Sequence, residues 1–129
     1  MWMNGKEVYA FAKKAMVESC LRVLDPGATA SRKELRNSLQ QVDRIIPHQA
    51  NARIILAAAE ALESMLEFPD GEVKNKMVVT IEKYGNNSTA SIPLAFDQSF
   101  REGKLHRGDL VILVGFGAGL TYGANLLRF

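Results

Sequence analysis

The chain has 129 residues, which is enough for one domain with its own hydrophobic core but too few for a second. Its 47% hydrophobic and 23% charged residues are typical of a folded globular protein and exclude a disordered or fibrous class. The formal net charge of +2 is close to neutral, so nothing in the charge supports binding to nucleic acid.

Two helices are predicted in the first third of the chain. Apolar residues recur at three- and four-residue steps from Glu7 to Leu24, which is the pattern of an amphipathic helix, and Asp25-Pro26-Gly27 ends it. Ser31 and Glu34 have the spacing of a capping box, so a short helix is expected through about Gln40.

Three compact apolar segments are predicted as strands, with helices between them. The strands are Val42–Pro47, Met77–Ile81 and Asp109–Val114, and the helices run from Ala52 to Leu66 and from about Ser88 to Gly103. Strands that alternate with helices indicate an α/β fold with a mostly parallel sheet flanked by helices.

The last segment, Leu120–Phe129, is predicted as a further strand. Only the five residues of the glycine-rich run Gly115–Gly119 separate it from the preceding strand. A parallel crossover needs a much longer connection, so the C-terminal strand is expected to be antiparallel.

Cysteine and targeting signals are sparse. Cys20 is the single cysteine, which excludes an intrachain disulfide and a multi-cysteine metal cluster. It lies on the apolar stripe of the first helix, where an inert buried thiol is expected rather than a nucleophile. No apolar run approaches the roughly 20 residues of a membrane span, and the N-terminus lacks the apolar core of a signal peptide. A cytoplasmic protein without a membrane partner is expected.

Polar side chains follow two of the predicted strands at the points where they end. His48 comes directly after Pro47, and Asn86 and Ser88 follow the strand that ends at Ile81. Right-handed crossovers bring the ends of parallel strands to one edge, so we expect these residues and the glycine run to converge. A neutral histidine and an asparagine amide are donors suited to an oxygen that becomes negative during a reaction. Spacing alone leaves equally open that His48 merely caps a strand.

Other chemistries have weaker support. The run Gly115–Gly119 resembles a dinucleotide fingerprint, but it joins two strands instead of opening a helix. The sequence has no G-x-S-x-G elbow and no Walker lysine. His48 and His106 are too few and too separated for a zinc site. We therefore expect neither a metal nor a cofactor.

Three motifs, in this order, carry a resemblance to a known family. They are Pro47-His48-Gln49-Ala50-Asn51, Tyr84-Gly85-Asn86-Asn87-Ser88-Thr89-Ala90-Ser91 and Gly115-Phe116-Gly117-Ala118-Gly119-Leu120-Thr121-Tyr122-Gly123. The chain closely resembles the C-terminal portion of 3-oxoacyl-acyl-carrier-protein synthase III (beta-ketoacyl-ACP synthase III), a thiolase-like condensing enzyme. The resemblance implies that residues 1–129 form a single C-terminal half-domain that lacks its first strand or strands and the N-terminal half of the enzyme.

This resemblance also implies an activity. The family is an acyltransferase that condenses acyl-CoA, such as acetyl-CoA, with malonyl-ACP, with decarboxylation, to initiate fatty-acid synthesis. By position, His48 and Asn86 stabilise the enolate formed when carbon dioxide leaves. The backbone amide of Ala118 helps form the oxyanion hole for the acyl thioester, and Arg53 helps dock the acidic acyl carrier protein. No cofactor is implied beyond these substrates.

The family's nucleophilic cysteine belongs to the absent N-terminal half, and Cys20 does not match it in context. The resemblance thus implies a chain that is inactive alone, pairs with its own N-terminal half and is part of a homodimer in the complete enzyme. Asn87 stands where the family usually has threonine, and Glu60 and Glu63 stand where basic residues are expected. Two alternatives stay open: a non-catalytic binding or oligomerisation module, and part of a related synthase of the polyketide or hydroxymethylglutaryl type.

Overall fold

The computed structural model describes residues 5–129, so the first residues of the stretch examined for a signal peptide lie outside it. Its helices are α1 (Gly5–Leu24), α2 (Arg32–Gln41), α3 (Ala52–Leu66), α4 (Ile81–Tyr84) and α5 (Ser91–Arg101). Its strands are β1 (Arg44–Pro47), β2 (Leu110–Gly117) and β3 (Thr121–Arg128). Short 3₁₀ turns occur at Lys74–Lys76, Ser88–Ala90 and Ala118–Leu120.

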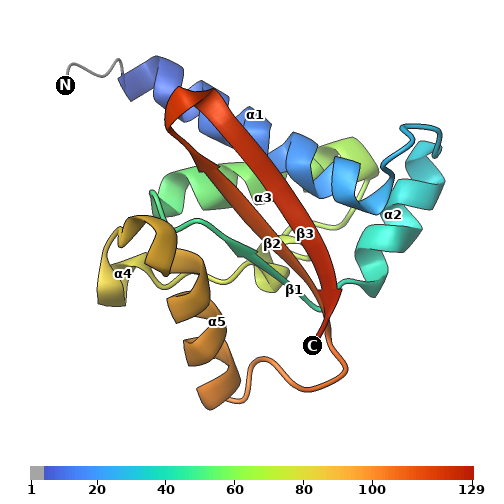
Figure 1. Ribbon diagram of the computed structural model, residues 1–129. Coiled ribbons are helices and arrows are strands. Elements are labelled where there is room, and N and C mark those ends of the chain that lie inside the picture. Colours follow the sequence, from blue (N-terminus) through green and yellow to red (C-terminus); the bar gives the residue numbers. More distant parts are fainter. Residues whose placement is uncertain (1–4) are drawn as a thin grey trace.

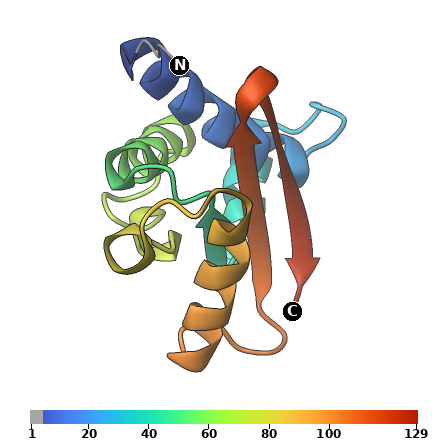
Figure 2. The same ribbon diagram turned by 60° about the vertical axis from the view of Figure 1, so that its left-hand side comes forward.

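The strands form one mixed sheet in the order β1-β2-β3 (Figure 1). β1 is parallel to β2, with Ile45 opposite Ile112 and Pro47 opposite Val114. β2 and β3 form an antiparallel hairpin whose two strands extend well beyond the short β1 (Figure 2). The predicted α/β half-domain, with helices between strands and an antiparallel C-terminal strand, is confirmed.

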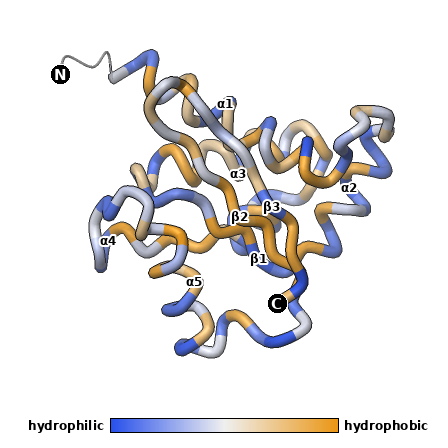
Figure 3. The backbone as a smooth tube through the Cα atoms, in the orientation of Figure 1, coloured by the Kyte–Doolittle hydropathy of each residue, from blue (hydrophilic) through white to orange (hydrophobic). Residues whose placement is uncertain are grey.

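Helices pack against both faces of the sheet. Because side chains alternate along a strand, Ile45, Ile112 and Val114 join one buried cluster with α1 and α3, whereas Ile46 and Val111 join another with α5. Figure 3 shows that hydrophobic residues concentrate along the strands. No helix within residues 5–129 combines the length and apolar character needed to cross a bilayer.

Local capping sets the helix starts. Ser31 and Glu34 form the predicted capping box, in which the Ser31 Oγ accepts the Glu34 N–H and Glu34 Oε2 accepts the Ser31 N–H at 2.7 Å. Asn51 Oδ1 accepts the Arg53 N–H at 2.8 Å and begins α3. The last predicted helix starts later than expected, at Ser91, because residues 88–90 form a 3₁₀ turn.

The predicted strand at Met77–Ile81 is wrong. Met77 makes one isolated parallel bridge to Ile45 of β1. The N–H of the next residue, Val78, donates to the Ile45 carbonyl at 2.9 Å. The following backbone groups bond instead to the side chain of Gln49, which donates to the Val78 carbonyl and accepts the Thr80 N–H. Backbone groups that are already bonded to the Gln49 side chain cannot also pair with a neighbouring strand. The short helix α4 then begins at Ile81.

Candidate active site

His48 is the first residue after β1, and its backbone and ring are both anchored to β2. Its N–H donates to the Val114 carbonyl at 2.7 Å, which extends the β1–β2 pairing by one residue. The imidazole packs edge-on against the ring of Phe116, with ring centroids 5.2 Å apart and an interplanar angle of 72°. His48 as a whole is half-buried.

The start of α5 holds the same ring from another side. His48 Nδ1 lies 2.6 Å from the Oγ of Ser91, the first residue of α5, and this hydroxyl is buried. The Gln49 N–H donates to the same Oγ at 3.2 Å. Ser91 therefore links the end of β1 to α5, a role that the sequence analysis did not assign to it.

Gln49 fixes the loop that carries His48. The side chain is 1% exposed, and its Nε2 donates to the Pro47 carbonyl at 2.8 Å and to the Val78 carbonyl at 3.0 Å. Its Oε1 accepts the Thr80 N–H at 2.8 Å. With both ends of the amide bonded in the interior, Gln49 determines the path of the backbone on either side of His48.

Burial also sets the charge of the histidine. Partial loss of hydration lowers the pKa of His48 from its ordinary value, because the charged imidazolium loses more solvation than the neutral ring. A neutral imidazole carries one N–H donor and one acceptor nitrogen. Nδ1 contacts Ser91, and Nε2 has no hydrogen-bond partner among residues 5–129, so it can serve a bound molecule.

Asn86 lies in the exposed loop that leads from α4 to Ser91. Its Oδ1 accepts the Ser88 N–H at 3.0 Å. This bond orients the amide group and leaves its Nδ2 hydrogens without a partner in the described part of the chain. Within the same residues, no hydrogen bond connects Asn86 directly to His48.

Ala118 and Arg53 lie at the margins of this arrangement. Ala118 is exposed in the 3₁₀ turn at the tip of the β2–β3 hairpin, where its carbonyl accepts the Thr121 hydroxyl at 3.1 Å. The tip is shaped by backbone of positive φ, 83° at Gly119 and 45° at Leu120. Arg53 is exposed in the first turn of α3, and its side chain makes no ion pair with any described residue.

The structure thus brings together one residue of each predicted motif: His48, Ser91 and Phe116. Among residues 5–129, neither Asn86 nor Ala118 forms a hydrogen bond with the imidazole. A hollow of about 420 Å³ adjoins Phe116 between the hairpin and α5. Its wall includes Ile92, Leu113, Gly115, Gly117 and Asn125.

Cys20 is an inert thiol, as the sequence predicted. It is fully buried in α1, and burial raises its pKa to about 12. A thiol with this pKa is almost entirely protonated near neutral pH, and the thiolate is the reactive form. Burial and the raised pKa both disfavour the thiolate form of the chain's single cysteine.

The fold and site together define a class of protein. Solved structures of thiolase-like condensing enzymes share this arrangement of helices around a mixed three-stranded sheet. The structure is similar to 3-oxoacyl-[acyl-carrier-protein] synthase III from Aquifex aeolicus, with a TM-score of 0.77 and 41% identity. This similarity covers 99% of the present chain and 36% of that chain.

The family model described as "3-Oxoacyl-[acyl-carrier-protein (ACP)] synthase III C terminal" matches residues 33–129, and the chain belongs to this family. It is 46% identical over 127 residues to Beta-ketoacyl-[acyl-carrier-protein] synthase III of Oceanobacillus iheyensis. That alignment covers 98% of the chain but only 36% of the relative, so the chain spans about a third of the relative's length. The structure is also similar to the priming beta-ketosynthase from the R1128 polyketide biosynthetic pathway, at 32% identity and a TM-score of 0.70, over 98% of this chain and 34% of that one.

Proposed function

We propose that this chain is the single C-terminal domain of an acyltransferase that condenses acyl-CoA with malonyl-ACP, with decarboxylation, to initiate fatty-acid synthesis. The observation that carries the proposal is the position of His48, which is half-buried, favoured in its neutral form and fixed between β2 and α5. The 46% identity to a beta-ketoacyl-ACP synthase III supports the choice of reaction.

The proposed chemistry divides between this chain and the rest of the enzyme. When malonyl thioester loses carbon dioxide, the electron pair of the broken bond passes to the thioester carbonyl oxygen as an enolate. His48 Nε2–H and Asn86 Nδ2–H donate hydrogen bonds to this oxygen. The enolate carbon then attacks the acyl thioester on a cysteine outside this chain, and the thiolate leaves. The Ala118 N–H stabilises the oxyanion of that second step, and no cofactor takes part.

Loss of the histidine and asparagine donors tests these roles in the complete enzyme. His48→Ala and Asn86→Ala should each lower decarboxylation of malonyl-ACP by about 10²–10³-fold, because each removes one donor to a developing oxyanion. Acyl transfer from acyl-CoA to the cysteine should survive. His106→Ala is the matched control, since this second histidine is exposed in a turn and should leave both steps unchanged. Loss of acyl loading alone in the first two variants would contradict the assignment.

The chain alone should not catalyse condensation, because Cys20 is buried with a raised pKa. Adding the N-terminal half of the enzyme as a separate polypeptide should restore activity. Condensation by the chain alone would contradict the proposal that the nucleophilic cysteine lies outside it.

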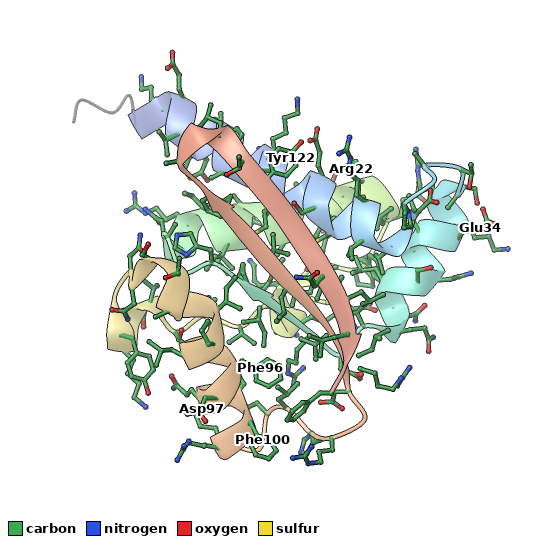
Figure 4. All side chains as sticks on the ribbon, viewed as in Figure 1. Arg22, Glu34, Phe96, Asp97, Phe100 and Tyr122 are labelled. Atoms are coloured by element: carbon green, nitrogen blue, oxygen red, sulfur yellow. The ribbon has the colours of Figure 1, made fainter. Side chains whose placement is uncertain are left out.

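The open side of α5 supports the N-terminal half as a partner. An apolar hollow of about 350 Å³ lies there, lined by Ile92, Pro93, Phe96, Asp97, Phe100 and Leu113. Phe100 is 43% exposed, and Figure 4 shows it near the C-terminal end of α5. Since this chain covers 36% of the relative, the remainder of such an enzyme is the longer part, and we assign this surface to contact with that part, within a homodimeric enzyme. Phe100→Glu should block complementation, whereas the neighbouring exposed change Arg101→Glu should not.

Arg53 is the proposed contact for the acidic acyl carrier protein. Its guanidinium, which forms no ion pair with residues 5–129, can steer an acidic partner from near the start of α3, and this attraction is weakened by salt. Arg53→Glu should raise the KM for malonyl-ACP more than the KM for acyl-CoA. Lys33→Glu on exposed α2 is the charge-matched control, and an equal effect of both changes would argue against a specific contact.

A polyketide-type priming synthase is the second candidate, favoured by the likeness to the R1128 priming beta-ketosynthase. The complete enzyme would then prefer a polyketide carrier protein over that of fatty-acid synthesis, which competition between the two substrates would reveal. A non-catalytic module is the third candidate, and the complementation experiment tests it directly: failure to restore activity, with carrier-protein binding retained, would favour it.

A further inference from the structure

The buried hydroxyl of Ser91 has one proton and a restricted choice of acceptors. Ser91 is 2% exposed, so its O–H cannot be satisfied by bulk water. The contact at 3.2 Å comes from the Gln49 N–H, which is a donor and occupies a lone pair of the oxygen. Among residues 5–129, the one acceptor within hydrogen-bond distance of this hydroxyl is His48 Nδ1, at 2.6 Å.

This arrangement decides which nitrogen of the neutral ring carries the proton. If Nδ1 were protonated, the Ser91 oxygen would receive two N–H groups and its own hydrogen would be buried without an acceptor, which is costly. If the Ser91 O–H donates to Nδ1, every group is satisfied and the ring proton lies on Nε2. We infer that Ser91 is a positioning residue that holds His48 as the Nε2–H tautomer, with Nε2 available as a hydrogen-bond donor.

The catalytic value of this tautomer rests on the proposed function. An enolate oxygen needs a hydrogen-bond donor, and an unprotonated Nε2 could not supply one. The remaining contacts fit this role. Phe116 packs against the ring by its edge, and the Gln49 N–H holds the Ser91 oxygen in place. Neither contact depends on the proton position, so Ser91 is the group that selects the tautomer.

Nitrogen NMR of the chain tests the inference directly. The sequence contains two histidines, so long-range correlations from the ring protons to ¹⁵N-labelled imidazole nitrogens can be assigned with a His106→Gln variant. The same chain unfolded in urea gives the reference for rings whose tautomers exchange freely. For folded wild-type protein at neutral pH, we expect Nδ1 of His48 to be of the unprotonated type and Nε2 of the protonated type.

Two substitutions separate positioning from simple packing. Ser91→Ala removes the donor, and both His48 nitrogens should shift toward the exchange-averaged positions of the unfolded reference. Ser91→Thr keeps a hydroxyl and should show the wild-type nitrogen pattern. If the alanine variant does not fold, the threonine variant still tests whether a hydroxyl at this position is enough to hold the tautomer. His48 protonated on Nδ1 in the wild type, or identical nitrogen shifts in wild type and Ser91→Ala, would overturn the inference.

Decarboxylation by the complete enzyme then separates this inference from the proposed function. If Ser91→Ala shifts the tautomer and lowers kcat for decarboxylation, while the KM for malonyl-ACP is retained and Ser91→Thr restores kcat, both stand. If the tautomer shifts but decarboxylation is unchanged even in His48→Ala, the positioning role stands and the proposed function fails.

Discussion

The two faces of the sheet are held by different forces. On the face toward α1 and α3, eighteen of the described residues are buried in one continuous apolar cluster. On the face toward α5, the buried cluster has five residues, and an apolar hollow beside it is open. Hydrogen bonds add to the second face: Gln49 to the 78–80 segment, Ser91 to the histidine, and Arg44 Nε to the Lys104 carbonyl at 2.8 Å.

The two faces therefore differ in how much of their stability comes from apolar burial and how much from hydrogen bonds. The packed face supplies stability mainly through apolar burial, although Glu63 of α3 is also buried there and accepts the Lys74 N–H. The α5 face uses directional bonds, which fix the orientation of individual groups more closely than apolar contacts do. His48 is held from both sides: its Nδ1 contacts Ser91 of α5, and its ring packs against Phe116, which borders the large cluster.

The largest expected effect comes from the packed face. Ile112 and Leu113 are neighbours in β2, but Ile112 is fully buried against the large cluster and Leu113 borders the hollow beside α5. Ile112→Ala should lower the free energy of unfolding by about 3 kcal/mol, and Leu113→Ala by about 1 kcal/mol. Urea unfolding of both variants measures the difference. Equal losses would mean that the two faces are packed equally well.

Removal of the Gln49 amide should have the next largest effect. Gln49→Ala leaves the Val78 carbonyl and the Thr80 N–H without their partners in the interior, at a cost of about 2 kcal/mol. Gln41→Ala, at an exposed site near the end of α2, is the control and should change stability by less than about 0.5 kcal/mol. Faster hydrogen exchange at residues 78–80 in the Gln49 variant alone would locate the effect.

Titration of His48 should have a smaller effect on stability. Burial lowers the pKa of His48 in the folded chain, so the unfolded chain binds this proton more readily. Stability is therefore complete above the ordinary histidine pKa of about 6.5 and falls as pH decreases through it toward the folded pKa. Between about pH 7 and pH 5, His48→Asn should lose less stability than the wild type. A steeper loss in the variant would contradict the direction of the shift.

The smallest effect on stability is expected near the hairpin tip, where Tyr122 contacts α1. Figure 4 labels Tyr122 beside α1. Its hydroxyl donates to Glu18 at 2.7 Å, and this bond lowers the pKa of Glu18. Tyr122→Phe should raise the pKa of Glu18 toward its ordinary value while stability hardly changes, since the ring contact with Phe11 remains. Carboxyl NMR follows the titration, with Tyr9→Phe as a control that should leave Glu18 unchanged.

Local signals in the sequence predicted most of the fold. Ser31 and Glu34 are three residues apart, so their capping box can be read directly from the sequence. His48 could be placed because Pro47 ends an apolar run. Ser91 could not be assigned a role, because its partner is 43 residues away and only the folded chain brings the two together.

The failed strand at Met77–Ile81 has the same origin. Its β-branched residues favour an extended backbone, but pairing depends on which groups occupy the neighbouring edge. The side chain of Gln49, 31 residues from Thr80, takes the place that a strand would have filled. The β-propensity of residues 77–81 contains no information about a distant side chain that bonds to their backbone.

Cys20 provides an internal reporter for these experiments. As the chain's single thiol, buried in the large cluster and with its pKa raised to about 12, it should be protected from alkylating reagents in the native state. Alkylation should then require opening of the packed face, so its rate under native conditions would measure how often that face opens. Substitutions beside α5 that loosen the active site without opening the core should leave this rate unchanged.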